Sequence, residues 1–475
     1  MKKNFLYYLL PSIIIGGASS LIMVPLTTYY LDPKDFGIAA IINAVTMPLG
    51  PLASTGVAWV LSAHYFVIDE SQRKIMLFNL LVFDLISRFI WVALFWLLSP
   101  WLLPVIIKDF QPQYLFFFRL SLIALFLTTL WSSISALIVL QQRGFVHALF
   151  EVGQWLFGAI ATVVCLVILR YRTLTLFLAP IASSAFSFFL GLLYVRKYIT
   201  VKFVKKWLRE MLKVGLPSMP TDFSEMARNI SDRYFIQRWL NLSVLGLYSH
   251  SQSYRNMFIM GHRASMRTLS PIAIEIFSTG GSPQRLDLAL KKWYGLLCAG
   301  GIFVTFFSRE IVTILTHGKF TAAAPLVPIW YLMLFAFTYS YVYTNYLLVK
   351  KRNLFIMYMT IFVNICAIAF TGWAVFYFGI MGATVAIVLA TLALQVAKKV
   401  YAAILGCPEV GDRYFYFGIA LMLICYVAEK VVPLNIYEKI LVVVVLCGFV
   451  SWRSRIVDDI ITTLRTIGKR ERNAS

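Results

Sequence analysis

The sequence predicts an all-α, polytopic membrane protein with about fourteen transmembrane helices. Three observations predict this class. Of the 475 residues, 60% are hydrophobic and only 13% are charged, apolar runs long enough to span a bilayer recur along the whole chain, and Lys and Arg collect in alternate loops. Soluble chains carry about 25% charged residues. A surface exposed to water could not be covered by so few polar groups, so lipid is the solvent that fits this composition.

The predicted helices follow from the length of the apolar runs. A helix needs about 20 residues to cross roughly 30 Å of hydrocarbon, and helices satisfy their own backbone hydrogen bonds in lipid. The segments that meet this requirement are 5–31, 36–66, 77–103, 114–140, 147–169, 174–195, 214–240, 244–277, 288–315, 325–349, 354–378, 380–397, 414–432 and 436–452. The last two are the shortest, so a count of twelve stays open. The first run continues to Thr28, which favours a retained helix over a cleaved signal peptide.

The orientation follows from the positive charges, because Lys and Arg are enriched in cytoplasmic loops. With a cytoplasmic N-terminus, 27 of them lie on the cytoplasmic side and 7 on the opposite side. Both termini are therefore predicted in the cytoplasm. These loops account for the net charge of +22, and we expect no nucleic-acid partner.

An internal repeat organises the segments into lobes. At an offset of 209 residues, the stretch 30–37 (YLDPKDFG) corresponds to 239–246 (WLNLSVLG), 141–143 corresponds to 350–352, and Pro11 corresponds to Pro220. We therefore predict an N-terminal six-helix lobe over 1–195, a basic cytoplasmic linker over 196–213 and a C-terminal six-helix lobe over 214–406. A terminal helix pair with a basic cytoplasmic tail follows over 407–475. An even number of helices per lobe makes the repeat a parallel one.

Three stretches carry a family resemblance: Tyr29–Gly37, Gly215 to Tyr248, and Asn364 to Ala383. In their order and spacing the chain resembles the polysaccharide-transport (Wzx-type, O-antigen or lipid-linked oligosaccharide flippase) branch of the multidrug/oligosaccharidyl-lipid/polysaccharide exporter superfamily. The resemblance implies two helical bundles around a central cavity and alternating access. It also implies a polyprenyl-pyrophosphate-linked glycan as cargo, membrane lipids and polysaccharide (lipopolysaccharide) assembly proteins as partners, and the bacterial inner membrane as location.

Charged residues at bilayer depth are functional candidates, because burying them in hydrocarbon is costly. They concentrate in segments 214–240 and 244–277. The substrate-binding candidates are Arg228, Arg233, Arg255, Arg263 and Arg267, since guanidinium groups bind phosphate oxygens bidentately. The cavity-lining or coupling candidates are Asp84, Asp222, Glu225, Asn229, Asp232 and His262.

A structural interpretation competes with the functional one at several of these positions. Arg228 can reach Asp232 at i+4 and Glu225 at i−3, which would form an internal ion-pair network. Asp84 and Arg88, also at i+4, indicate a second internal pair. Arg255 and Arg263 have no acidic residue within four positions of their own helix, which favours cargo binding. Arg267 lies toward the cytoplasmic end, where a long side chain can reach the interface.

Two other functions stay open as alternatives. A cation-coupled multidrug exporter would need acidic residues in the first lobe, where only Asp84 and Glu151 lie within the spans. A multi-pass glycosyltransferase or polymerase would use a catalytic acid such as Asp32, but the second lobe replaces both aspartates of the turn 32–35. We interpret that turn as a helix start and expect no enzyme. The six cysteines lack metal-ligand spacing, so no metal or cofactor is expected; coupling to H⁺ or Na⁺ stays open.

Overall fold

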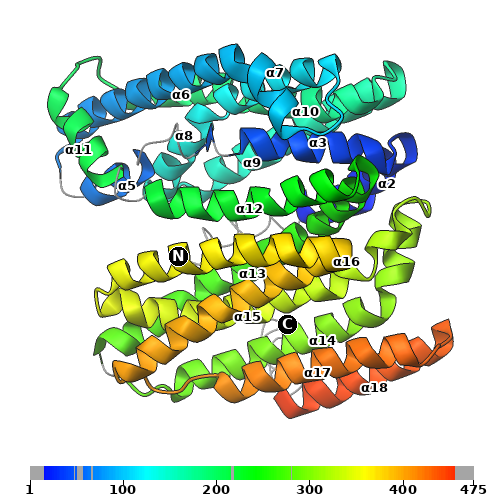
Figure 1. Cartoon of the computed structure of the whole chain (residues 1–475). Coiled ribbons are helices and arrows are strands. Elements are labelled where there is room, and N and C mark those ends of the chain that lie inside the picture. The colour runs from blue at the N-terminus through cyan, green and yellow to red at the C-terminus, as the bar shows by residue number, and fades with distance from the viewer. Residues whose placement is uncertain are drawn as a thin grey trace, which may run out of the picture. The chain divides into compact units, whose positions relative to one another are not determined.

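The computed structural model describes residues 15–47, 49–50, 57–65, 68–215, 219–279 and 281–454, and every regular element in these ranges is a helix (Figure 1). This confirms the predicted all-α fold class. Pro11 and the tail 455–475 lie outside the described residues.

The helices are α2 (Val24–Tyr30), α3 (Pro33–Thr46), α5 (Val57–His64), α6 (Glu70–Ile106), α7 (Pro112–Leu127), α8 (Thr129–Leu140), α9 (Gly144–Val163), α10 (Thr175–Val195), α11 (Lys205–Gly215), α12 (Met219–Trp239), α13 (Leu242–Thr279), α14 (Gln284–Leu315), α15 (Leu326–Val349), α16 (Asn353–Ile404), α17 (Asp412–Val431) and α18 (Ile436–Ser454). Short helical turns precede or join them at Ser19–Met23, Val164–Ile168, Arg172–Leu174, Arg196–Tyr198 and Thr321–Ala323.

The helices follow the predicted segments, and two joints explain where they differ. The segment 114–140 consists of α7 and α8, which meet at Thr128. The segments 354–378 and 380–397 both lie within α16, which is broken at Gly379, where φ is 60° and ψ is −142°. A Cβ on Gly382 would lie 2.1 Å from the Ala374 carbonyl oxygen, so the chain folds back on itself at this break. Glycine tolerates this left-handed backbone because it has no Cβ.

Seven helices of the described ranges are long and apolar enough to cross a membrane. Two predicted spans, 354–378 and 380–397, count as the one helix α16, and two others, 5–31 and 36–66, fall partly outside the described residues. The remaining predicted spans differ for two further reasons. Some are divided into shorter helices, as α7 and α8 are, and others, such as α12 and α13, carry many charged side chains. The protein is a multi-pass membrane protein, and the count of fourteen spans is compatible with the helices but stays a prediction.

The predicted linker contains an amphipathic helix that the hydropathy pattern did not indicate. Helix α11 buries Trp207 and Met211 against a core cluster that includes Val60 and Leu80, and its basic side chains are exposed. The segment before it is held by Asn79, whose Nδ2 donates to the Lys202 carbonyl at 2.7 Å and whose Oδ1 accepts from the Val204 amide at 2.8 Å. Such a helix suits the interface between lipid and water.

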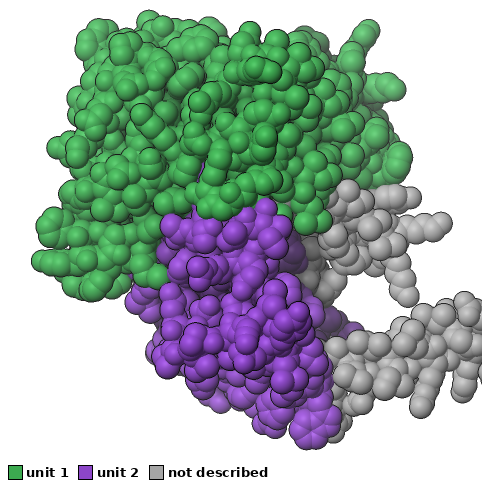
Figure 2. Space-filling view, turned by 90° about the vertical axis from the view of Figure 1, so that its right-hand side faces the viewer, with its two compact units in different colours: residues 1–250, 315–319, 360–383 green, residues 251–314, 320–359, 384–475 purple. Residues whose placement is uncertain are grey.

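The described chain forms two compact units (Figure 2). The first comprises residues 1–250, 315–319 and 360–383, and the second comprises residues 251–314, 320–359 and 384–475. The first unit therefore combines the helices of the predicted N-terminal lobe with α12 and the beginning of α13. The division into four segments predicted from the repeat stays a prediction.

Within the first unit, the two repeated turns pack directly on each other. The turn before α3 begins the helix as predicted, with Asp32 at the N-cap, Pro33 in the first turn, and Asp35 Oδ2 accepting from the Asp32 amide at 2.9 Å. A Cβ on Gly37 would lie 1.8 Å from the Leu242 carbonyl oxygen, and one on Gly246 would lie 1.7 Å from the Pro33 carbonyl oxygen. Only glycine permits so close an approach of two backbones.

Three charged residues hold the same turn. Asp32 Oδ2 lies 2.7 Å from Arg172 Nη2, and Asp32 Oδ1 lies 3.1 Å from Lys319 Nζ. Lys319 Nζ also donates to the carbonyl of Tyr29 at 2.9 Å. The hydrogen bond and charge of Lys319, together with the charge of Arg172, lower the pKa of the Asp32 carboxyl below its usual value of 3.8. We call Asp32, Arg172 and Lys319 the turn cluster.

Candidate functional site

The polar side chains of helix α12 differ in how far they are buried in the protein. Asp232 is buried, Arg228, Asn229 and Arg233 are half-buried, and Glu225 is exposed. The side chain of Asp222 lies outside the described residues. Residues 360–383 of α16 pack on this helix, where Asn364 Nδ2 donates to Ser224 Oγ at 3.0 Å and the Gly372 backbone lies close to the Phe235 ring. These contacts hold α12 against α16 near Ser224 and Phe235.

The carboxylate of Asp232 is held by hydrogen bonds within the protein. Tyr248 Oη donates to Asp232 Oδ2 at 2.5 Å, and the Arg233 amide donates to Oδ1 at 2.7 Å. Tyr248 is fully buried, so this bond joins α12 to the beginning of α13 away from water. Arg228 Nη2 lies 3.5 Å from Asn229 Oδ1. The predicted network of Arg228 with Asp232 and Glu225 stays a prediction.

Arg233 lines a cavity of about 410 Å³ in the first unit. The cavity lies among α3, α7, α10 and α12, and Arg233 Nη1 lies 3.6 Å from Met47 Sδ at its margin. Its lining residues are Asn43, Thr46, Met47, Ser121, Ala124, Leu125, Thr128, Leu176, Phe177, Pro180, Ser184 and Arg233. Among the described residues that line it there is one cation, several hydroxyl or amide groups, and no carboxylate. We call this space the Arg233 cavity.

The chemistry of the Arg233 cavity suits a polar anion. Hydroxyl and amide side chains donate and accept hydrogen bonds, as sugar hydroxyls do, and a guanidinium group binds phosphate oxygens in a planar, bidentate geometry. The sequence indicated Arg233 but missed the uncharged groups. Asn43, Thr46 and Ser121 interrupt apolar stretches of sequence, which is one pattern expected of a polar cavity lining. The pattern is not specific, because such residues also occur where membrane helices pack closely.

Arg255, on the part of α13 that belongs to the second unit, packs on an aromatic ring. Its guanidinium carbon lies 4.8 Å from the centroid of the Trp330 ring, and its Nη2 lies 3.4 Å from Asn256 Oδ1. Trp330 is fully buried and donates from Nε1 to Ser251 Oγ at 2.9 Å. The ring therefore stabilises this position of the guanidinium through a cation–π contact. Trp330 carries no sequence signal that pairs it with Arg255.

The other candidates on α13 differ in their surroundings. His262 is buried among aromatic rings, with centroid distances of 5.9 Å to Trp293, 6.2 Å to Phe337 and 6.0 Å to Tyr341. Arg263 is exposed. The side chain of Arg267 lies outside the described residues. Arg255, His262 and Arg263 thus share one helix of the second unit, where each has a different environment.

Asp84 belongs to a buried pair in α6, as the i+4 spacing predicted. Its Oδ1 lies 3.9 Å from Arg88 Nε, and its Oδ2 accepts from Ser133 Oγ at 2.9 Å. Arg88 Nη1 lies 3.5 Å from the Leu125 carbonyl oxygen. Both side chains are almost fully buried, so each charge depends on the other for compensation. The described residues contain no cluster of three or more metal-ligating side chains.

Comparisons with known proteins agree with this architecture. The family model described as "polysaccharide biosynthesis protein" matches residues 29–279 of this chain. A search of curated proteins finds no match.

Several solved structures share the fold at low sequence identity. Lipid II flippase MurJ in its inward closed conformation has a TM-score of 0.70 and 13% identity, and the alignment covers 97% of this chain and 100% of that chain. An inward-facing multidrug resistance MATE family transporter of the MOP superfamily has a TM-score of 0.62 and 13% identity, with 83% of this chain and 97% of that chain covered. An outward-facing structure of such a transporter has a TM-score of 0.56 and 14% identity, with 85% of this chain and 95% of that chain covered.

Proposed function

The chain belongs to the polysaccharide biosynthesis protein family, and from this premise we propose that it is a flippase for a polyprenyl-pyrophosphate-linked oligosaccharide. The cargo would move from the cytoplasmic to the periplasmic leaflet of the bacterial inner membrane, without chemical change. An O-antigen repeat unit of lipopolysaccharide is the cargo that the sequence resemblance implies. The fold shared with a lipid II flippase supports a lipid-linked glycan as cargo class.

The Arg233 cavity is the observation that carries this proposal. A pyrophosphate and several sugars cannot cross hydrocarbon alone, because each unpaired charge or hydroxyl would lose its hydration. A cavity of about 410 Å³ that offers a guanidinium and uncharged polar groups replaces part of that hydration. The cavity could hold the charged head group, and the polyprenyl chain would remain among the lipid tails.

The turn cluster supports the second requirement of transport, which is sidedness. Asp32, Arg172 and Lys319 lie in loops that the charge distribution places on the periplasmic side. Lys319 follows the third helix of the predicted C-terminal lobe, and Asp32 follows the first helix of the N-terminal lobe, so their ion pair joins the two repeats. Opening a path to the periplasm would separate these residues, and closing it would restore the contact. In this scheme the turn cluster and the two turn glycines form the periplasmic seal.

The proposal includes the topology and partners predicted from the sequence. Both termini would lie in the cytoplasm, next to the enzymes that assemble the glycan, and polysaccharide assembly proteins would receive it in the periplasm. Any coupling ion would be H⁺ or Na⁺.

Complementation of a flippase-deficient strain tests this function. Wild-type protein is expected to restore surface polysaccharide, and Arg233→Ala is expected to lower restoration at least tenfold because it removes the charge. Arg233→Lys should retain part of the activity. Arg238→Ala is the matched control, since Arg238 is an exposed arginine on the same helix.

Each outcome of this experiment is decisive. Equal restoration by wild type and Arg233→Ala, at equal membrane levels, would remove the Arg233 cavity from the mechanism. Failure of the wild type in its cognate strain, together with raised drug resistance, would favour the multidrug exporter instead.

A further inference from the structure

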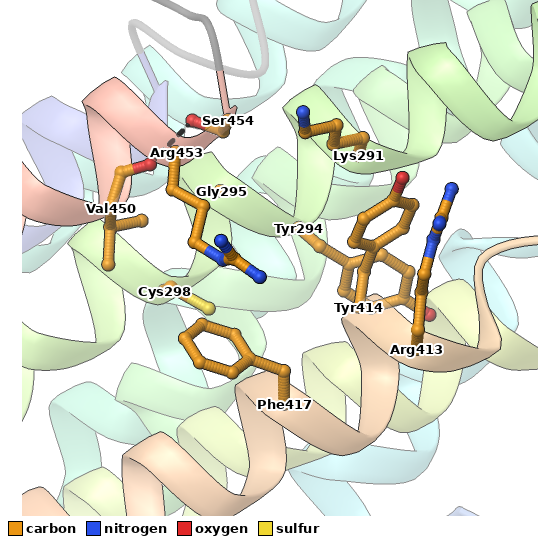
Figure 3. A pocket seen from close by; sticks show the side chains of 10 residues that line it. All are labelled: Lys291, Tyr294, Gly295, Cys298, Arg413, Tyr414, Phe417, Val450, Arg453 and Ser454. Atoms are coloured by element: carbon orange, nitrogen blue, oxygen red, sulfur yellow. Dashed lines mark hydrogen bonds between the residues drawn. The ribbon is translucent and has the colours of Figure 1, made fainter.

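A second cavity, separate from the Arg233 cavity, lies in the second unit (Figure 3). It has a volume of about 460 Å³ and lies between α14, α17 and α18. Its lining residues are Lys291, Tyr294, Gly295, Cys298, Arg413, Tyr414, Phe417, Val450, Arg453 and Ser454. We call it the α14–α17–α18 pocket. No function considered above uses it.

The pocket combines an apolar part with cations from three helices. Arg453 extends its guanidinium toward Cys298 and Phe417, and Arg413 lies next to Tyr414 (Figure 3). Lys291 completes the set from α14. A ligand complementary to this lining carries both a negatively charged group and an apolar group.

The cations are only partly balanced by protein carboxylates. Arg413 Nη2 lies 2.9 Å from Asp287 Oδ2, which also accepts from Tyr414 Oη at 3.1 Å. No carboxylate of the described residues forms an ion pair with Lys291 or Arg453, and none lines the pocket. Two positive charges therefore remain for a ligand, and a phosphate group is an anion that both Lys and Arg bind with charge-assisted hydrogen bonds.

The position of the pocket selects a lipid over a soluble anion. Lys291, Arg413 and Arg453 all lie on the side that the charge distribution predicts to be cytoplasmic, at the ends of membrane-spanning segments. The outer faces of α17 and α18 beside the pocket are apolar and exposed. The large side chains on them include Tyr416, Leu423, Ile424, Val427, Leu441, Val444, Val445, Phe449 and Trp452. Acyl chains can lie on these faces when the head group occupies the pocket.

We propose that the α14–α17–α18 pocket binds the phosphate of an anionic phospholipid of the cytoplasmic leaflet. Lys291 and Arg453 contact the phosphate oxygens, Tyr294 and Tyr414 contact the polar remainder of the head group, and the acyl chains lie along α17 and α18. Basic pockets between transmembrane helices on the cytoplasmic side are suited to such head groups. The bound lipid would hold the terminal helix pair against α14. This inference depends on the membrane location and not on the proposed cargo.

Native mass spectrometry of the purified full-length protein, titrated with phosphatidylglycerol and with phosphatidylcholine, tests the proposal. Wild-type protein is expected to retain phosphatidylglycerol in preference to phosphatidylcholine. In the double variant Lys291→Ala, Arg453→Ala the affinity for phosphatidylglycerol should fall about fivefold for each cation removed. The matched control is Arg285→Ala, Arg352→Ala, which removes two exposed cytoplasmic charges from the same unit outside the pocket. Thermal unfolding in phosphatidylcholine nanodiscs verifies that both double variants are folded.

Three results would overturn the inference. Equal phosphatidylglycerol retention by the pocket variant and the control would show that the pocket is not the site. Displacement of the lipid by millimolar inorganic phosphate would indicate a site for a free anion. Displacement by a short-chain polyprenyl pyrophosphate, with no preference for phosphatidylglycerol, would assign the pocket to the cargo. None of these readouts requires transport, so the proposed function can fail without affecting this test.

Discussion

Gly37 and Gly246 occupy equivalent places in the two repeats, and each lies against a backbone carbonyl of the other repeat. The position of a Cβ on Gly37 is 1.8 Å from the Leu242 carbonyl oxygen, and that on Gly246 is 1.7 Å from the Pro33 carbonyl oxygen. Pro33 and Leu242 are themselves related by the 209-residue offset. The contact is therefore reciprocal, as expected where an approximate two-fold axis that relates the two repeats passes between these turns.

Replacing either glycine by alanine should prevent this contact. Gly37→Ala and Gly246→Ala each place a methyl group on a backbone carbonyl that cannot rotate away, so we expect a loss of about 1–3 kcal/mol or more in the free energy of unfolding. Gly261→Ala is the control, because a Cβ there meets nothing within 4 Å. Thermal unfolding of the three purified variants measures the difference. A melting temperature of Gly37→Ala equal to that of Gly261→Ala would contradict the tight packing.

Locking the turn cluster should stop transport. The variant Asp32→Cys, Lys319→Cys replaces an ion pair of 3.1 Å with two thiols that a short bifunctional reagent can join. We expect cross-linking to abolish restoration of surface polysaccharide, because the periplasmic seal can no longer open. A reducible reagent should allow recovery on reduction, and the two single-cysteine variants serve as controls. Full transport by the cross-linked protein would refute the seal.

The turn cluster should persist to unusually low pH. The pKa of Asp32 is lowered from 3.8, first by the hydrogen bond from Lys319. A carboxyl with a lowered pKa in the folded state contributes stability above its ordinary pKa, and that contribution disappears as the pH falls through the lowered value. Hydrogen exchange of the amides in 31–37 (Pro33 has none), corrected for intrinsic rates, should thus be unchanged down to pH 3.8 and rise only below that value. In Lys319→Ala the rise should begin at higher pH.

Arg255 should matter more for transport than Arg263. The Trp330 ring orients Arg255, and a cation–π contact of this kind is worth about 0.5–2 kcal/mol. Arg263 is exposed. We expect Arg255→Ala to lower complementation several-fold more than Arg263→Ala, and Arg255→Lys to lie between. The reverse order would show that the aromatic contact does not prepare Arg255 for cargo.

Asp84 should contribute to the stability of the folded protein and not directly to transport. Asp84→Asn leaves the Arg88 guanidinium buried without its counter-charge, which typically costs about 3–5 kcal/mol, and the melting temperature should fall accordingly. Asp84→Leu combined with Arg88→Met should recover most of that loss, because an apolar pair needs no compensation. If Asp84→Asn instead keeps its melting temperature but loses transport, Asp84 is a coupling residue.

Local pattern was sufficient for the helices, the turn and the buried pair. Hydropathy located the segments 354–378 and 380–397 on either side of Gly379, and the i+4 spacing indicated that Asp84 and Arg88 interact. The capped turn at Asp32 was also predicted. These features depend on residues within a few positions of one another, where helix geometry alone determines which side chains meet.

Helix α11 also has a local sequence pattern, but hydropathy does not indicate it. Trp207 and Met211 lie four residues apart among basic side chains, which is the pattern of an interfacial helix. The segment is too strongly charged to have the hydropathy of a transmembrane span.

The amino-acid sequence alone predicts the fold class, the helical segments and the 209-residue repeat, because lipid imposes length and polarity on every spanning helix. Three other contacts are visible only in the folded chain: Arg233 lines a cavity with Asn43 and Ser121, Arg255 lies on Trp330, and Lys319 reaches Asp32. These partners come from segments far apart in the chain. Their contacts depend on the rotation and crossing of each helix, which follow from packing of side chains over whole interfaces and not from any short stretch of sequence.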